Sequence, residues 1–322
     1  MGGSTWRRRA RAALACLALP LGACAPPVPQ RLEIATNVWP GYEPLYLARD
    51  RGLLDPAIDF VECTSASDVM RVVRHGAVDA AALTLDEVLL VRAAGVDLRV
   101  VLVLDVSHGA DAIVAQPSVT SLAGLRGKRV GVENTAVGGY VLARAMQIAG
   151  LARDDLRTVH LVPSEQQRAF VERQVDAVVT FEPTRSLLLA QGGHVVFDST
   201  QLPNEIIDVL AVRAEVLARP PSQLRALTRA WFGALAELER DPQEAAALMA
   251  GRLRLPPEGI IASLGGLRFP SIAENRAFLR REGGLARSAA GLAASMIEHG
   301  LLTTALDTTG ISSDVLFKEP SL

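Results

Sequence analysis

The chain has 322 residues and a formal net charge of −2 at pH 7; 49% of its residues are hydrophobic and only 4% are aromatic. No basic patch indicates a nucleic-acid partner, and no run beyond the first 23 residues is long and apolar enough to cross a membrane. Of its cysteines, only Cys63 is expected to remain as a thiol in the mature domain, which excludes an internal disulfide.

The N-terminal residues 1–23 predict a lipoprotein signal peptide. Four arginines between residues 7 and 11 precede a short apolar run, which ends in Leu21-Gly22-Ala23-Cys24. This tetrad resembles the lipobox of bacterial lipoproteins, in which cleavage precedes a lipidated cysteine. We therefore expect an exported protein that is lipid-anchored through Cys24 on the periplasmic or extracellular face, with residues 24–31 as a tether. A plain secretory signal and a twin-arginine signal are the alternatives.

Short apolar runs alternate with helical periodicity from Leu32 onward. The alternation predicts a mostly parallel sheet with right-handed crossovers. Gly52 and Gly95 are expected to end helices, and Ser67 is a candidate N-cap. The expected elements are strand Leu32–Val38, helix Tyr42–Arg51, strand Ile58–Thr64, helix Ser67–His75, strand Ala80–Leu83, helix Asp86–Ala94, and strands Leu98–Leu104 and Asp111–Ala115.

The same plan then begins again, which predicts a second α/β lobe. A Leu-Ala-Arg triplet precedes Gly-Leu in both halves, and Val-Asp-Ala opens a strand in both. The expected elements are strand Lys128–Glu133, helix Val137–Ala149, strand Arg157–Val162, helix Ser164–Arg173, strand Ala177–Phe181, helix Pro183–Ala190 and strand His194–Asp198.

The last third of the chain is predicted to be helical. After a strand at Ile206–Arg213, Pro256-Pro257 marks a break and Trp231 lies on an apolar helix face that is expected to pack. The expected helices are Pro221–Glu239, Pro242–Arg252, Ile272–Arg280 and Leu285–His299.

An aromatic cluster lies on the first predicted strand-to-helix turn. Trp39 and Tyr42 flank Pro40 and Gly41 in a chain that has few aromatic residues. In open α/β sheets, ligands bind at the carboxyl ends of the strands, and flat aromatic faces are common in small-molecule pockets. We predict that Trp39 and Tyr42 stack on a ligand; the alternative is that they are ordinary core residues.

Several motifs together resemble the substrate-binding proteins of ABC importers that serve nitrate, taurine, aliphatic sulfonates and thiamine pyrimidine precursors. The likeness covers roughly residues 32–300, and it lies in the order of the motifs rather than in any one of them. The motifs are Asn37–Tyr42 with Tyr46–Arg49, Val78–Ala81, Gly109–Ile113, Leu125–Glu133, Phe181–Pro183 and Asp208–Arg213.

The resemblance implies an α/β fold of the type II periplasmic binding protein class, in which two doubly wound lobes are joined by a two-segment hinge. We place the hinge near Gln116–Ser118 and Asn204–Ile207. Lobe 1 is then residues 32–116 and 208–322, and lobe 2 is residues 117–207. Such proteins close on a ligand that contacts both lobes. The expected partners are a small-molecule ligand and the permease and ATPase of the importer; a monomer without cofactor or metal is expected.

The cleft is expected to be lined by strand-to-helix turns from both lobes. Several candidates have structural alternatives: Asp86 as a helix N-terminal charge, His108 as a surface residue, Thr135 and Glu182 as caps, and Asp208 as a hinge brace. The candidate ligand-binding residues are Trp39, Gly41, Tyr42, Thr84, Leu85, Asp86, Ser107, His108, Glu133, Thr135, Gly138, Glu182 and Asp208.

The charges of these candidates favour a neutral or cationic nitrogen-bearing ligand, such as an aminopyrimidine. The candidate turns carry four carboxylates, and only His108 and Arg185 are on the positive side, whereas an oxyanion requires inward Arg, Lys or many N–H donors. The four are Asp86, Glu133, Glu182 and Asp208. The helix start at Thr135 and Gly138, whose free N–H groups bind anions, argues for the alternative, a sulfonate, taurine or nitrate-type anion.

No catalytic signature indicates an enzyme. The chain lacks GxSxG, phosphate-loop, HExxH and CxxC motifs, and its five histidines lack metal-ligand spacing. The same fold hosts a pyrimidine-precursor synthase of yeasts, but the Cys-rich motif of that enzyme is absent here. A ligand-sensing subunit of a signalling protein remains an alternative to transport.

Overall fold

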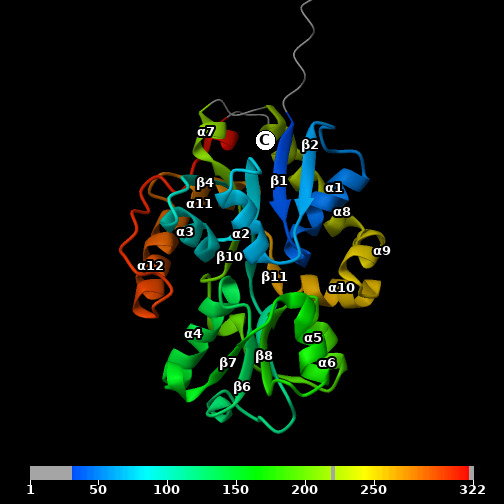
Figure 1. Ribbon diagram of the computed structural model, residues 1–322. Coiled ribbons are helices and arrows are strands. Elements are labelled where there is room, and N and C mark those ends of the chain that lie inside the picture. The colour runs from blue at the N-terminus through cyan, green and yellow to red at the C-terminus, as the bar shows by residue number, and fades with distance from the viewer. Residues whose placement is uncertain (1–30, 219–221, 319–322) are drawn as a thin grey trace, which may run out of the picture. The chain divides into compact units, whose positions relative to one another are not determined.

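Two β-sheets organise the chain in the computed structural model, which describes residues 31–218 and 222–318 (Figure 1). The first sheet has the strand order β11-β4-β10-β3-β1-β2, and the second has the order β7-β6-β8-β5-β9. The first sheet contains β1 (Leu32–Thr36), β2 (Ile58–Glu62), β3 (Ala80–Thr84), β4 (Leu98–Ser107), β10 (Ile207–Arg213) and β11 (Leu267–Arg268). The second contains β5 (Asp111–Ala115), β6 (Arg129–Val132), β7 (Arg157–His160), β8 (Ala177–Phe181) and β9 (His194–Asp198).

Both sheets are mixed, which corrects the expectation of a mostly parallel first sheet. Strand β1 pairs in parallel with β2 and β3, but β10 runs antiparallel between β3 and β4. Strand β5 is likewise antiparallel to its neighbours β8 and β9. Each of these strands follows a passage of the chain from one sheet to the other, so its direction depends on a long-range return that local periodicity does not encode.

The strand predicted at Asp111–Ala115 forms, but it belongs to the second sheet and not to the first lobe. The chain leaves the first sheet after Ser107 and has joined the second by Asp111, so the expected crossing at Gln116–Ser118 is wrong. The chain returns between the end of β9 at Asp198 and the start of β10 at Ile207.

The helices of the first two hundred residues follow the predicted alternation. Helix α2 begins one residue earlier than expected because Ser65, rather than Ser67, accepts the capping hydrogen bond, from the backbone N–H of Asp68. Helix α4 ends at Gly150, whose φ of 64° is the left-handed conformation that terminates helices. These helices are α1 (Glu43–Asp50), α2 (Ala66–Arg74), α3 (Leu85–Ala93), α4 (Val137–Ala149), α5 (Pro163–Val171) and α6 (Thr184–Ala190).

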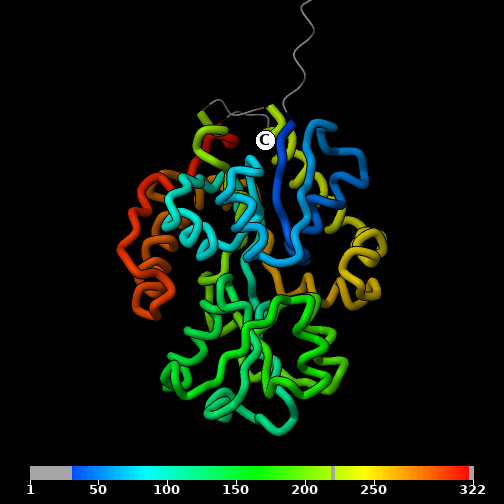
Figure 2. Tube along the Cα trace, viewed as in Figure 1, coloured from blue at the N-terminus to red at the C-terminus, as the bar shows by residue number. Residues whose placement is uncertain are grey.

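The C-terminal helices return to the part of the chain that holds the N-terminal strands, as the trace in Figure 2 shows. Helix α8 packs on α1, α11 on β4 and α12 on α3. Trp231 on α8 is fully buried, which confirms its predicted packing role. These helices are α7 (Ala214–Leu217), α8 (Ser222–Arg240), α9 (Pro242–Leu253), α10 (Pro257–Leu264), α11 (Ile272–Leu279) and α12 (Gly284–Glu298).

Helix α10 was not expected from the sequence. Pro256-Pro257 reads as a break, but Pro257 occupies the first turn of α10, where its missing N–H costs nothing. The predicted signal peptide, the lipidation at Cys24 and all but the last residue of the tether lie outside the described residues. Within the described ranges, none of the helices combines the length and the hydropathy that a bilayer span requires.

Candidate functional site

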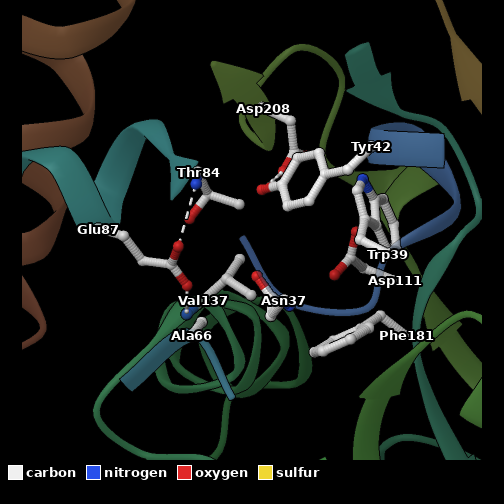
Figure 3. Close-up of a pocket in the computed structure, with 10 residues that line it drawn as sticks. All are labelled: Asn37, Trp39, Tyr42, Ala66, Thr84, Glu87, Asp111, Val137, Phe181 and Asp208. Atoms are coloured by element: carbon white, nitrogen blue, oxygen red, sulfur yellow. Dashed lines mark hydrogen bonds between the residues drawn. The ribbon is translucent and has the colours of Figure 1, made fainter. Parts of the chain in front are cut away.

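A small cavity lies between residues of the two sheets (Figure 3). Seven lining residues come from the first sheet and the helices on it, and three come from β5, α4 and β8 of the second. Ligand sites of this two-sided kind allow one solute to contact both halves of a protein. The cavity is lined by Asn37, Trp39, Tyr42, Ala66, Thr84, Glu87, Asp111, Val137, Phe181 and Asp208.

Aromatic rings from both sheets form one wall of this cavity. Trp39, on the turn after β1, meets Phe181 at the end of β8 edge to face, with ring centroids 5.6 Å apart and an interplanar angle of 83°. The side chain of Tyr42 lies beside them in the cavity lining. Trp39 and Tyr42 are almost fully buried, so each is both a core residue and a wall of the cavity. Their burial is that of core residues, and the stacking of both rings on a ligand stays a prediction.

Gly41 holds this wall in place because it has no side chain. The indole Nε1 of Trp39 donates a hydrogen bond to Asp105 Oδ2, at 3.2 Å, across the backbone of Gly41. A Cβ atom at position 41 would overlap both the Asp105 carboxylate and the Trp39 indole nitrogen. A glycine is thus required at position 41 because a side chain would clash there, and not because of its backbone conformation.

We expect Gly41→Ala to break the Trp39–Asp105 hydrogen bond and displace the indole. Overpacking of this kind costs roughly 1–3 kcal/mol of unfolding free energy, measurable by urea denaturation, and should change the near-ultraviolet circular dichroism of the tryptophans. The matched control is Gly251→Ala in α9, where a Cβ meets nothing within 4 Å and a gain of roughly 0.5–1 kcal/mol is expected. Equal effects of the two substitutions would contradict this assignment.

Carboxyl groups dominate the polar lining. Tyr42 donates its hydroxyl to Asp208 Oδ1 at 2.6 Å, while Oδ2 of Asp208 and Oδ2 of Asp111 are buried and accept no hydrogen bond from the described residues. Glu87 and Asp111 lie on opposite sides of the cavity (Figure 3). Asp105 stands directly opposite Asp208 in the pairing of β4 with β10. Unpaired acceptors of this kind in a cavity are suited to a ligand that supplies hydrogen-bond donors.

Burial raises the pKa values of these carboxyl groups, because a charged form loses its hydration. The pKa of Asp111 rises to about 7, and those of Asp105 and Glu87 rise to about 8. For Asp208, burial and then the charge of Asp105 raise the pKa well above its ordinary value. At neutral pH the cavity thus holds carboxyl groups that are poised between their charged and neutral forms.

Four further predicted residues lie beside the cavity rather than in its lining. Glu133 is buried and accepts hydrogen bonds from the backbone N–H and the hydroxyl of Ser67, and the hydroxyl of Thr135 also bonds to that of Ser67. Asp86 is buried, and burial raises its pKa to about 6, but its side chain faces a separate groove shared with Ser67 and Thr135. Gly138 belongs to the first turn of α4, close against the backbone of residue 133.

The remaining predicted residues make other contacts. Leu85 is a fully buried core residue, and His108 is exposed. Ser107 hydrogen-bonds to the hydroxyl of Ser199, at 2.9 Å, where the chain passes between the sheets. Both carboxylate oxygens of Glu182 accept hydrogen bonds from Arg185 and Ser186 of α6, the helix that follows it. None of these residues lines the cavity.

Six lining residues were not among the candidate ligand-binding residues. Three of them lie in motifs that the sequence analysis identified, and a fourth is next to a candidate residue. Asn37, Asp111 and Phe181 belong to the motifs that carry the family resemblance, and Glu87 follows Asp86 directly. Ala66 and Val137 are the first residues of α2 and α4, and no sequence signal distinguishes them. Within residues 31–218 and 222–318, no group of three His, Cys, Asp or Glu side chains is arranged to hold a metal ion.

Among curated proteins, a putative aliphatic sulfonates-binding protein of Escherichia coli (strain K12) is 30% identical to this chain over 166 residues. The match covers 49% of this chain and 52% of that protein, so the chain spans about half the length of this relative.

Solved structures of binding proteins superpose on nearly all of the fold. The alkanesulfonate-binding protein of Xanthomonas axonopodis pv. citri, bound to MOPS, has a TM-score of 0.72 at 22% identity and covers 88% of this chain and 96% of its own. The periplasmic nitrate-binding protein of Synechocystis PCC 6803 has a TM-score of 0.74 at 13% identity, covering 90% and 87%. The predicted fold, that of the type II periplasmic binding proteins, is confirmed.

The family model of the NMT1-like family matches residues 25–253, which is most of the chain. The sequence motifs, the two mixed sheets and the shared cavity agree with this match. The chain therefore belongs to the NMT1-like family.

Proposed function

We propose that this protein captures a small solute between its two lobes and delivers it to the permease and ATPase of an ABC importer. The cavity, which takes residues from both sheets, is the observation that carries this proposal. A solute bound there contacts both halves at once and stabilises their closed arrangement. A lipid anchor at Cys24 would hold the protein beside the permease.

We further propose that the solute is neutral or cationic and bears nitrogen donors, as in an aminopyrimidine or an amine. The lining includes the carboxyl groups of Glu87, Asp111 and Asp208, and no Lys or Arg is among the described residues that form it. The first N–H group of α4, on Val137, donates to Glu87 Oε1 at 3.1 Å and is thus already engaged. An oxyanion would enter this cavity without a counter-charge and next to unpaired carboxylate oxygens.

The second candidate ligand is a sulfonate or related anion, and the names of the relatives favour it. The relatives compared above bind, by their names, aliphatic sulfonates, alkanesulfonates and nitrate. The protonated forms of the cavity carboxyl groups, and Asn37 at its edge, would be the donors for such an anion. The two candidates differ in the sign of the charge that the cavity accepts, so one experiment separates them.

A thermal-shift screen of the purified protein tests both candidates. The panel contains aminopyrimidines, primary and quaternary amines, taurine, alkanesulfonates and nitrate. A ligand at 100 times its Kd adds about 2.7 kcal/mol of stability, which corresponds to a rise of about 5 °C or more in the melting temperature. We expect the shift with a pyrimidine or an amine.

Two variants establish where the ligand binds. Asp111→Asn should abolish most of the shift, whereas Asp154→Asn, which removes an exposed carboxylate between α4 and β7, should leave it unchanged. A shift with sulfonates alone would keep the capture function and replace the ligand class. A shift that survives Asp111→Asn would place binding outside this cavity.

A further inference from the structure

A pair of reciprocal contacts joins the two lobes next to the cavity. Glu133, which follows β6 of the second sheet, accepts a 3.0 Å hydrogen bond from the backbone N–H of Ser67 in the first turn of α2, which packs on the first sheet. Glu87, in α3 of the first lobe, accepts a 3.1 Å hydrogen bond from the backbone N–H of Val137 at the start of α4 in the second. Each lobe thus places a carboxylate on the N-terminus of a helix in the other.

The two contacts are strong by their chemistry and protected by their surroundings. The N-terminus of a helix carries partial positive charge and free N–H groups, so a carboxylate is a favourable partner there, and charge-assisted hydrogen bonds are stronger than neutral ones. The Glu87 contact becomes charge-assisted above pH 8, because burial raises the pKa of Glu87 to about 8. Glu87 and Glu133 are both about 2% exposed. The hydroxyl of Ser67 adds hydrogen bonds to Glu133 and to Thr135, both in the second lobe.

The two contacts lie beside the cavity that a solute would enter, because residues at or next to both contacts line it. Ala66, which begins α2, and Val137, which begins α4, both line the cavity, as does Glu87 itself. The helix starts that are joined across the lobes therefore form one wall of the cavity (Figure 3). Parting of these contacts would open that wall.

We infer that Glu87 and Glu133 form a latch that holds the lobes together in the absence of ligand. The second oxygen of Glu87 accepts a 3.0 Å hydrogen bond from the backbone N–H of Thr84, which fixes the carboxylate at the start of α3. The Glu87 half of the latch is thus anchored to the first turn of α3. A solute enters when both contacts part together, and the latch re-forms over it. The purpose of the latch rests on the proposed capture function, but the contacts do not require a ligand.

Amide hydrogen exchange of the ligand-free protein, resolved at single residues by NMR, tests this inference. The two reporters are the N–H groups of Ser67 and Val137, which exchange only when the latch opens. Glu133→Gln keeps an acceptor oxygen but removes the charge. We expect it to speed exchange by about tenfold at Ser67 and, because the lobes part as units, also at Val137, which Glu133 does not contact. Glu87→Gln should speed exchange at the same two amides above pH 8, where Glu87, whose pKa burial raises to about 8, is ionised.

The controls separate a latch from two independent local contacts. Glu274→Gln alters a carboxylate that accepts a 2.8 Å hydrogen bond from the N–H of Ser271 within one lobe, so it should leave Ser67 and Val137 unchanged. Ser67→Ala, which removes only the hydroxyl, should give a smaller acceleration at Val137. Acceleration confined to the amide that each mutated carboxylate touches would overturn the latch, as would unprotected amides in the wild-type protein. No ligand is needed, so failure of the latch is distinguishable from failure of the proposed function.

Discussion

The melting temperature of the ligand-free protein should fall by roughly 5 °C or more between pH 5 and pH 8. Burial raises the folded-state pKa of Asp105 and Glu87 to about 8 and that of Asp111 to about 7, whereas these groups titrate near pH 4 in the unfolded chain. Between these values the folded state binds more protons than the unfolded state, so stability decreases as pH rises. One unit of pKa shift is worth about 1.4 kcal/mol, and each kcal/mol moves the melting temperature by roughly 2–4 °C.

Variants assign this pH dependence to the cavity. Asp208→Asn removes the carboxyl group whose pKa is raised by burial and by Asp105, while its amide oxygen still accepts the Tyr42 hydroxyl, so the fall should become smaller. Asp154→Asn should not change it. Burial also raises the pKa of Glu43 to about 7, so Glu43 contributes to the fall in melting temperature, and neither variant removes this contribution. Calorimetry across this pH range measures all three proteins, and a melting temperature that is constant or rises from pH 5 to pH 8 would contradict the prediction.

Local patterns in the sequence account for most of the strands and helices but not for how the strands pair. Alternating apolar runs and helix-ending glycines, such as Gly150, locate elements because those signals are local. The place of β5 in the second sheet and the reversed direction of β10 arise from contacts between segments far apart in the chain. Periodicity identifies Asp111–Ala115 as a strand without indicating its partner, so the first of the two predicted crossings lies several residues too late.

The sequence predicted which turns surround the cavity, but not in every case which residue of a turn lines it. Trp39, Tyr42, Thr84 and Asp208 line it, and Gly41 supports it, because strand ends on one side of a sheet converge. At the start of α3, however, Asp86 was chosen and Glu87 lines the cavity. Adjacent helix residues point about 100° apart, so a one-residue choice decides which carboxyl group meets the ligand. Glu182 was chosen for its charge, but its carboxylate accepts hydrogen bonds from Arg185 and Ser186 of the helix that follows it.

The affinity for a cationic ligand should increase as pH rises from 6 to 8.5, by up to about tenfold per pH unit for each proton released. A cation in the cavity favours the ionised forms of Asp111 and Glu87, whose pKa values burial holds at about 7 and about 8 in the empty site. Binding must therefore expel protons. An anion such as a sulfonate would favour the neutral forms, take up protons, and bind more tightly as pH falls.

Titration calorimetry at pH 7 in two buffers of different ionisation enthalpy measures this proton exchange directly. The probe should be a primary or quaternary amine from the thermal-shift panel, because its own charge is constant over the range. Asp111→Asn should reduce both the affinity and the number of protons released, since it removes a group that must ionise, whereas Asp154→Asn should change neither. Proton uptake when the amine binds, or an amine affinity that rises toward pH 6, would contradict the cationic ligand class. An alkanesulfonate that binds with proton uptake would show that the cavity takes an anion through its protonated carboxyl groups. The sign of the proton exchange thus decides between a ligand class that the cavity's own carboxyl groups favour and one that the names of the relatives favour.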